Sequence, residues 1–170
     1  MIYRLHGTIQ PYAWGGHDYI PQLLRREPSN LPAAELWFGD HPQAPSQIEA
    51  DGITLPFNDW LQKNLNHALT PASRARFGDR LPFLLKILDV RLPLSIQVHP
   101  DKAQAEAGYA REEAAGISQG AANRNYPDDN HKPESMIALG DFWLLHGFAP
   151  LNTIEERLAS RPSLATIAHL

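Results

Sequence analysis

The chain has 170 residues, of which 43% are hydrophobic and 20% are charged, a balance typical of one soluble domain with a hydrophobic core. Its net charge is −4 and its basic residues are scattered, which argues against a nucleic-acid partner. The absence of cysteine excludes disulfides and thiolate metal ligands. No stretch approaches the roughly 20 apolar residues that cross a bilayer, and the N-terminus has no apolar signal core, so we predict a cytoplasmic protein with no membrane partner.

The first half of the chain is predicted to contain short strands and helices divided by prolines. A turn at residues 11–16 carries Trp14, which either packs in the core or lines a pocket. Pro21 suits the first turn of a short helix, and Thr70 before Pro71 is typical of a helix N-cap followed by N1. The predicted elements are strands at 2–10, 33–38 and 46–49 and helices at 18–26, 56–65 and from 71.

The second half is predicted to alternate strands with two helices. Asp101 and Gln104 have the spacing of a capping box, which opens an Ala- and Glu-rich helix that runs to about residue 116. A polar loop follows to residue 130. The predicted elements are strands at 83–90, 94–99, 135–139 and 142–148 and a last helix that opens at 153–156.

Polar side chains alternate with apolar ones in the strand predicted at 94–99. In an extended chain Ser95, Gln97 and His99 share one face, and their Cα atoms are spaced by about 6.6 Å. Gln97 and His99 could then converge on one ion. Two alternatives stay open from the spacing: half of a metal site, or an edge strand that faces water.

A second cluster of polar residues lies at 130–134, with the sequence Asn-His-Lys-Pro-Glu. The residue before a proline is pushed out of the helical region, so Lys132 and Glu134 are predicted to face the same side. Together with the glutamine and histidine, Glu134 would make an oxygen and nitrogen ligand set that suits Zn²⁺. A solvated loop is the alternative. Lys86 is likewise either a snorkelling edge residue or a lysine desolvated in a pocket.

Five segments of the chain, in order, resemble the type I mannose-6-phosphate isomerases (phosphomannose isomerases). They are residues 11–16 (Pro-Tyr-Ala-Trp-Gly-Gly), 34–46 (Ala-Glu-Leu-Trp-Phe-Gly-Asp-His-Pro-Gln-Ala-Pro-Ser), 81–88 (Leu-Pro-Phe-Leu-Leu-Lys-Ile-Leu), 93–102 (Pro-Leu-Ser-Ile-Gln-Val-His-Pro-Asp-Lys) and 126–134 (Tyr-Pro-Asp-Asp-Asn-His-Lys-Pro-Glu). The resemblance extends from about residue 1 to 150.

The resemblance implies a mainly β fold with helical additions, a cupin-type (jelly-roll) β-barrel that is incomplete in 170 residues. It places the N-terminal part of the catalytic β domain at 1–150 and the start of a truncated helical region at 151–170. The implied activity is the interconversion of mannose 6-phosphate and fructose 6-phosphate through an enediol, with one Zn²⁺ per chain. In the family, a fourth ligand histidine and a phosphate-binding arginine lie beyond the position where this chain stops.

Site residues follow from the same motifs. The resemblance implies Gln97, His99 and Glu134 as metal ligands. The groups that it places around the substrate for proton transfer are Lys132, His131 and Lys86, and we expect Ser95 and Trp14 to contact the sugar phosphate.

A second hypothesis is a non-catalytic cupin-like fragment that binds a metal or sugar phosphate weakly, or needs a partner chain. Because an incomplete barrel leaves sheet edges unpaired, we expect the chain to self-associate.

Overall fold

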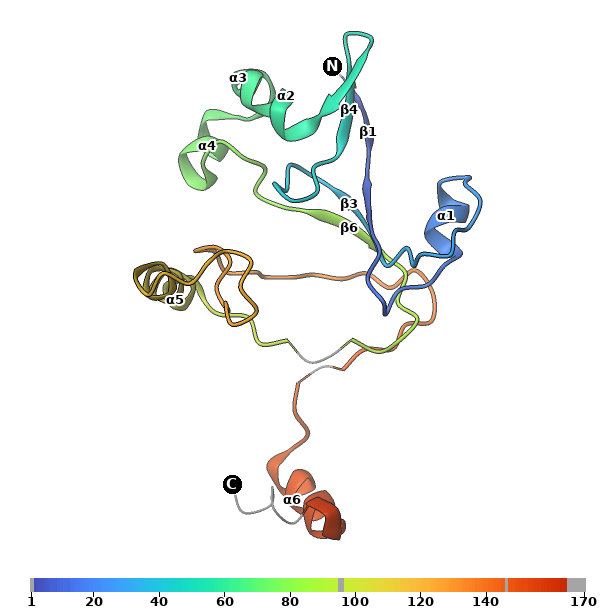
Figure 1. Ribbon diagram of the computed structural model, residues 1–170, viewed down its shortest axis with the longest axis vertical. Coiled ribbons are helices and arrows are strands. Elements are labelled where there is room, and N and C mark those ends of the chain that lie inside the picture. The colour runs from blue at the N-terminus through green and yellow to red at the C-terminus, as the bar shows by residue number, and fades with distance from the viewer. Residues whose placement is uncertain (1, 95–96, 146, 165–170) are drawn as a thin grey trace. The chain divides into compact units, whose positions relative to one another are not determined.

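A computed structural model describes residues 2–94, 97–145 and 147–164 (Figure 1). The chain divides into two compact units, residues 1–94 and 95–170, and each is described by itself. Every strand of the described residues lies in the first unit, whereas the second is built around one long helix. A domain boundary near residue 150 stays a prediction.

Two three-stranded antiparallel sheets form the first unit, with strand orders β1-β4-β5 and β2-β3-β6. The predicted strands at 33–38, 46–49 and 83–90 are confirmed as β3, β4 and β6. The strands are β1 (Arg4–His6), β2 (Thr8–Gln10), β3 (Glu35–Phe38), β4 (Gln47–Ala50), β5 (Ile53–Pro56) and β6 (Leu85–Leu88).

The single strand predicted over 2–10 is wrong, because the chain divides at Gly7 and its two halves pair in different sheets. A Cβ atom at position 7 would lie 2.8 Å from Leu36 Cδ1 and 2.9 Å from the carbonyl oxygen of Trp37. Only glycine permits this close approach, which lets the chain cross from one sheet to the other.

Strand β5 was not predicted from the sequence. It forms a hairpin with β4 through Asp51 and Gly52, whose φ angles are 50° and 78°. Two positive φ values are what the common two-residue hairpin turn requires, and Asp-Gly is its preferred sequence. The signal for this hairpin was therefore present in the chain.

Hydrophobic side chains of the helices and sheets form two core clusters in the first unit. One joins Ile48 of β4 to Phe57, Trp60 and Leu61 of α2, and the other is centred on Leu36 of β3. The predicted cap is confirmed, since the Thr70 hydroxyl accepts a hydrogen bond from the Ser73 amide at 3.1 Å. The helices are α1 (Tyr19–Leu23), α2 (Phe57–Lys63), α3 (Leu65–Ala68) and α4 (Pro71–Phe77).

The second unit contains α5 (Lys102–Ala114), α6 (Leu151–Ala159) and the 3₁₀ helix η1 (Pro162–Leu164). The predicted capping box is confirmed: the Asp101 carboxylate accepts from the Gln104 amide, and the Gln104 side chain accepts from the Asp101 amide. Helix α6 begins two residues before the predicted position. None of the helices in the described ranges is long and apolar enough to cross a membrane.

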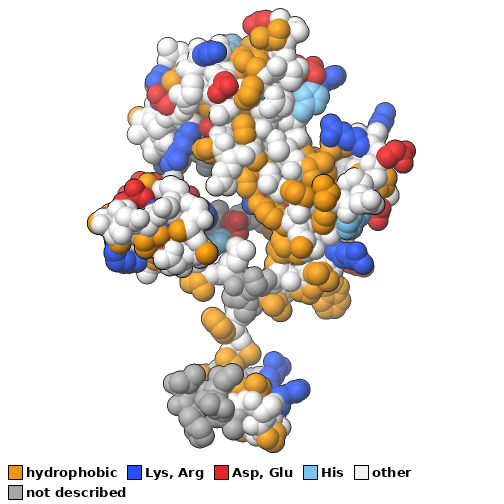
Figure 2. All heavy atoms as spheres, in the orientation of Figure 1, with side chains coloured by type: hydrophobic (Ala, Val, Ile, Leu, Met, Phe, Trp, Pro, Cys, Tyr) orange, Lys and Arg blue, Asp and Glu red, His pale blue; other side chains and the backbone are white. Residues whose placement is uncertain are grey.

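The strands predicted at 94–99, 135–139 and 142–148 are wrong for the residues that the structure describes, which form no strand there. A strand needs a hydrogen-bonded neighbour, and sequence alternation alone does not supply one. Apolar side chains in these segments are exposed, with Val98 at 86%, Ile137 at 85% and Trp143 at 83%. Figure 2 shows such side chains in orange along the segment before α6. Self-association through them stays a prediction.

Candidate metal centre

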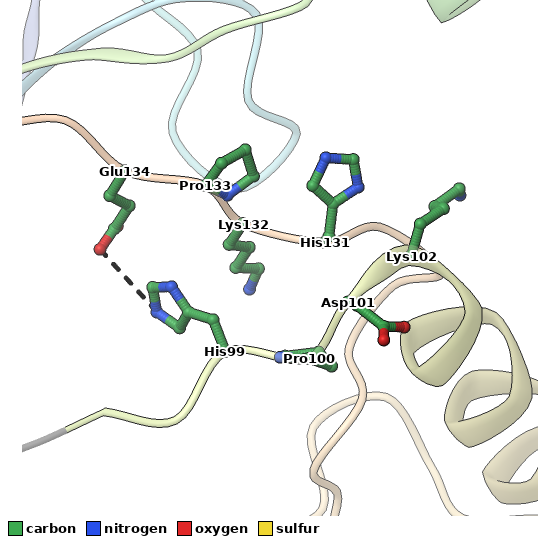
Figure 3. Close-up of a pocket in the computed structure, with 8 residues that line it drawn as sticks. All are labelled: His99, Pro100, Asp101, Lys102, His131, Lys132, Pro133 and Glu134. Carbon is green, nitrogen blue, oxygen red and sulfur yellow. Dashed lines mark ion pairs between the residues drawn. The ribbon is translucent and has the colours of Figure 1, made fainter.

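Three predicted ligand atoms converge around His99 in the second unit. The Nε2 atom of His99 lies 3.4 Å from Gln97 Oε1 and 3.8 Å from Glu134 Oε2, and Figure 3 shows the Glu134 carboxylate turned toward the ring. Two donors each about 2.1 Å from a tetrahedral ion lie about 3.4 Å apart. The 3.4 Å distance between Gln97 and His99 matches this geometry, and the 3.8 Å distance between His99 and Glu134 is about 0.4 Å longer.

The donor set combines one imidazole nitrogen, one amide oxygen and one carboxylate oxygen. The described residues contain no group of three or more histidine, cysteine, aspartate or glutamate side chains suited to a metal. The donor set is not such a group, because its third member, Gln97, is an amide. The side chains of His99 and Glu134 are 32% and 64% exposed, so the site opens to solvent. Three ligands leave a tetrahedral ion one position for another group.

A hollow of about 370 Å³ is lined by two of the three donor residues, His99 and Glu134. Its lining comes from two segments, residues 99–102 and 131–134. In Figure 3, Lys132 and Glu134 reach toward the segment that holds His99, while the ring of His131 points to the other side. This two-residue alternation is that of an extended chain, and it agrees with the predicted orientation of Lys132 and Glu134. The Lys132 ammonium lies 3.9 Å from Asp128 Oδ2.

Prolines shape both walls of the hollow. His99 precedes Pro100 and Lys132 precedes Pro133, and the residue before a proline is held in an extended conformation. Immediately after Pro100, Asp101 caps α5. The local sequence therefore gives each wall its backbone conformation, but it does not by itself bring the two walls together.

Contacts from α5 to residues 124–130 join the two walls, and the sequence analysis missed them. Near the N-terminus of α5, the Lys102 ammonium donates to the Asp129 carbonyl at 2.8 Å and to Asn130 Oδ1 at 3.1 Å. Near its C-terminus, the Glu112 carboxylate accepts from the amides of Asn125 and Tyr126 at 2.9–3.2 Å. The residues of these pairs are 13 to 28 positions apart in the sequence, so no local motif predicts the contacts.

Glu112 is buried, with 5% of its surface exposed. Burial acts to raise the pKa of its carboxyl. This effect is outweighed by hydrogen bonds from the Tyr126 and Asn125 amides and from the Asn125 side chain, together with the positive charge of Arg124, so the pKa is lowered. Glu112 is therefore held as the carboxylate. The Arg124 side chain, which is 2% exposed, also donates to the Ile117 carbonyl at 2.5 Å and to Glu113 at 2.6 Å, and these bonds hold the loop after α5 against the helix.

The other predicted site residues are not among the described residues of the second unit. Ser95 lies outside the described residues. Lys86 and Trp14 belong to the first unit. The ring of Trp14 stacks on Tyr12 at a centroid distance of 5.7 Å, and its carbonyl accepts from the amides of Arg91 and Leu92.

Lys86 faces β3 from β6, the last strand in its sheet order. Its ammonium lies 3.2 Å from Oε2 of buried Glu35, and Trp37 Nε1 donates to the same oxygen at 2.5 Å. The ammonium also lies 4.8 Å from the centre of the Trp37 ring. The position agrees with the edge alternative, but the partnership with a buried carboxylate was not foreseen.

Residues 2–151 match the family described as phosphomannose isomerase type I, catalytic domain. The chain belongs to this family. It is 44% identical over 157 residues to mannose-6-phosphate isomerase of Salmonella typhimurium, covering 91% of the chain and 40% of that relative. It is 47% identical over 164 residues to the mannose-6-phosphate isomerase of Emericella nidulans, covering 90% of the chain and 32% of that relative.

A solved structure agrees with this assignment. The structure of mannose 6-phosphate isomerase from Salmonella typhimurium, bound to fructose 6-phosphate and zinc, matches this chain with a TM-score of 0.69 and 45% sequence identity. The match covers 76% of this chain and 33% of the Salmonella chain. The predicted fold class, mainly β with helical additions and of the cupin type, is confirmed by this family and its structures. The chain spans about 40% or less of the length of these relatives.

Proposed function

We propose that the chain forms the metal-binding part of a zinc-dependent aldose–ketose isomerase that interconverts mannose 6-phosphate and fructose 6-phosphate. One observation carries this proposal: in a chain of this family, the Nε2 atom of His99 lies 3.4 Å from Gln97 Oε1 and 3.8 Å from Glu134 Oε2. The substrate and the metal come from the related Salmonella enzyme, which was solved with both.

Gln97, His99 and Glu134 would hold the zinc, with one ion per chain. Bound there, zinc would supply a Lewis acid that polarises the sugar carbonyl and stabilises negative charge on its oxygen. His99 and Glu134 line the hollow formed by residues 99–102 and 131–134, which has room for a sugar.

The isomerisation moves a proton between C1 and C2 of the sugar, so a group that accepts and returns this proton must lie beside the hollow. Lys132 is the strongest candidate, because its side chain projects into the space between the two walls, two residues from Glu134. His131 lines the same hollow, with its ring turned to the other side. We assign His131 and Lys86 supporting parts in proton transfer, and Trp14 and Ser95 parts in holding the sugar phosphate.

A zinc titration and a coupled assay test the proposal on the 170-residue chain. Competition with a chromophoric chelator gives the zinc affinity, and coupling fructose 6-phosphate formation to a dehydrogenase gives turnover. We expect one zinc per chain, and at least tenfold weaker binding for Glu134→Gln because a ligand with a formal charge is lost.

Glu155→Gln is the matched control, since this exposed carboxylate lies on α6 and is not among the residues that line the hollow. It should bind zinc as the parent chain does. Equal weakening in both variants would contradict the ligand assignment. Full zinc occupancy without turnover would favour the non-catalytic alternative for this polypeptide.

A further inference from the structure

We propose that Lys102 is a positioning residue of the candidate metal centre, which fixes the segment before Glu134 against the start of α5 so that the Glu134 carboxylate stays opposite His99. The inference rests on the proposed function of this centre. Lys102 lies three residues after His99 and touches none of the three donor atoms in the contacts of the described residues.

The ammonium of Lys102 has partners for all three of its hydrogen atoms. It donates to the Asp129 carbonyl at 2.8 Å and to Asn130 Oδ1 at 3.1 Å, and it pairs with Glu106 Oε1 at 3.1 Å. An ammonium group has three donors and no acceptor, so these partners account for its full capacity. A group bound in this way holds its partners in one geometry, although the side chain is 43% exposed.

The helix provides the fixed end of this connection. Glu106 lies one turn along α5 from Lys102, and the capping box of Asp101 and Gln104 stabilises the same turn. The lysine therefore projects from the capped first turn of the helix, directly after the segment that holds His99.

The loop end of the connection lies just before the ligand. Asn130 is four residues from Glu134, a distance of at most about 14 Å along an extended chain. Pro133 stiffens this short connection because its ring fixes φ. Restraint applied at Asp129 and Asn130 is therefore transmitted to Glu134, whose own side chain is 64% exposed and pairs with His99.

The Glu112 contacts hold a more distant part of the same loop, at Asn125 and Tyr126. They keep the loop on α5 but leave five residues between Tyr126 and Lys132. Lys102 acts inside this interval, so its loss should affect the ligand segment more than the helix.

Lys102→Met tests the inference, with Lys102→Arg as the conservative variant and Lys63→Met, an exposed lysine of α2, as the control. We expect zinc binding by the chain to be about tenfold weaker in Lys102→Met, the lower end of the effect of losing a supporting contact. Because arginine keeps several donors, Lys102→Arg should recover most of this loss, and Lys63→Met should match the parent.

Amide hydrogen exchange of the zinc-free chains gives an independent measurement. In Lys102→Met, a peptide covering 129–134 should exchange faster while a peptide covering 104–114 stays unchanged. Unchanged exchange at 129–134 would overturn the inference. Faster exchange in both peptides would also overturn it, since the lysine would then stabilise the helix in general. If the parent chain binds no zinc, the proposed function fails, and the exchange data still decide whether Lys102 holds the ligand segment.

Discussion

Replacing Gly108 of α5 with alanine should weaken the contact between the helix and the loop that leads to the candidate metal centre. A Cβ atom at position 108 would lie 2.4 Å from two atoms of the Tyr126 ring, far inside van der Waals contact. Alanine is favoured over glycine within a helix by about 1 kcal/mol. Overpacking a tight contact costs about 1 to 3 kcal/mol, so we expect a net loss of about 1 kcal/mol.

The tyrosine ring provides the test of this reasoning. In a Tyr126→Ala background the overlap is absent, and Gly108→Ala should then stabilise the helix by about 1 kcal/mol, a coupling of about 2 kcal/mol between the two positions. Hydrogen exchange of the α5 amides measures these free energies, since 1 kcal/mol changes the rate about fivefold.

Ala110, exposed on the same helix, is the control position. Ala110→Gly should cost about 1 kcal/mol in either background. If Gly108→Ala stabilised α5 equally with and without the Tyr126 ring, the close packing of ring and helix would be refuted.

Two further predictions concern the stability of the two units. Because its hydrogen bonds lower the pKa of Glu112, the stabilisation that this carboxylate gives is fully present above its ordinary pKa of about 4.5 and is lost as the pH falls through the lowered value. Protection of residues 125 and 126 from exchange should thus decrease below about pH 4, and Glu112→Gln should show low protection with no such decrease. Leu61→Ala should destabilise the first unit by about 2 to 5 kcal/mol in urea unfolding, since this side chain is fully buried at 0% exposure; exposed Leu23→Ala should cost much less, and equal losses would contradict the core assignment.

Part of the candidate site could be predicted from residue spacing and motif resemblance, because its donors come from short segments. The two-residue spacing of Gln97 and His99 and the proline after Lys132 are local features. In the structure the side chains of Gln97 and His99 approach each other although no strand forms at 97–99, and Glu134 faces His99. Lys102 could not be found in this way. Its partners lie 27 and 28 residues away, and a lysine in the first turn of a helix is ordinarily a solvated residue.

The sequence by itself determined the elements whose signals are local. The caps at Thr70 and Asp101 start their helices because the side chain satisfies a backbone amide a few residues away. Tertiary structure determined the elements whose pairing depends on distant residues. Gly7 divides one predicted strand because Leu36 and Trp37 lie against it. Residues 135–139 form no strand although their composition favours one. A strand forms only where a neighbouring strand accepts and donates its backbone hydrogen bonds, and the strand's own residues do not identify that neighbour.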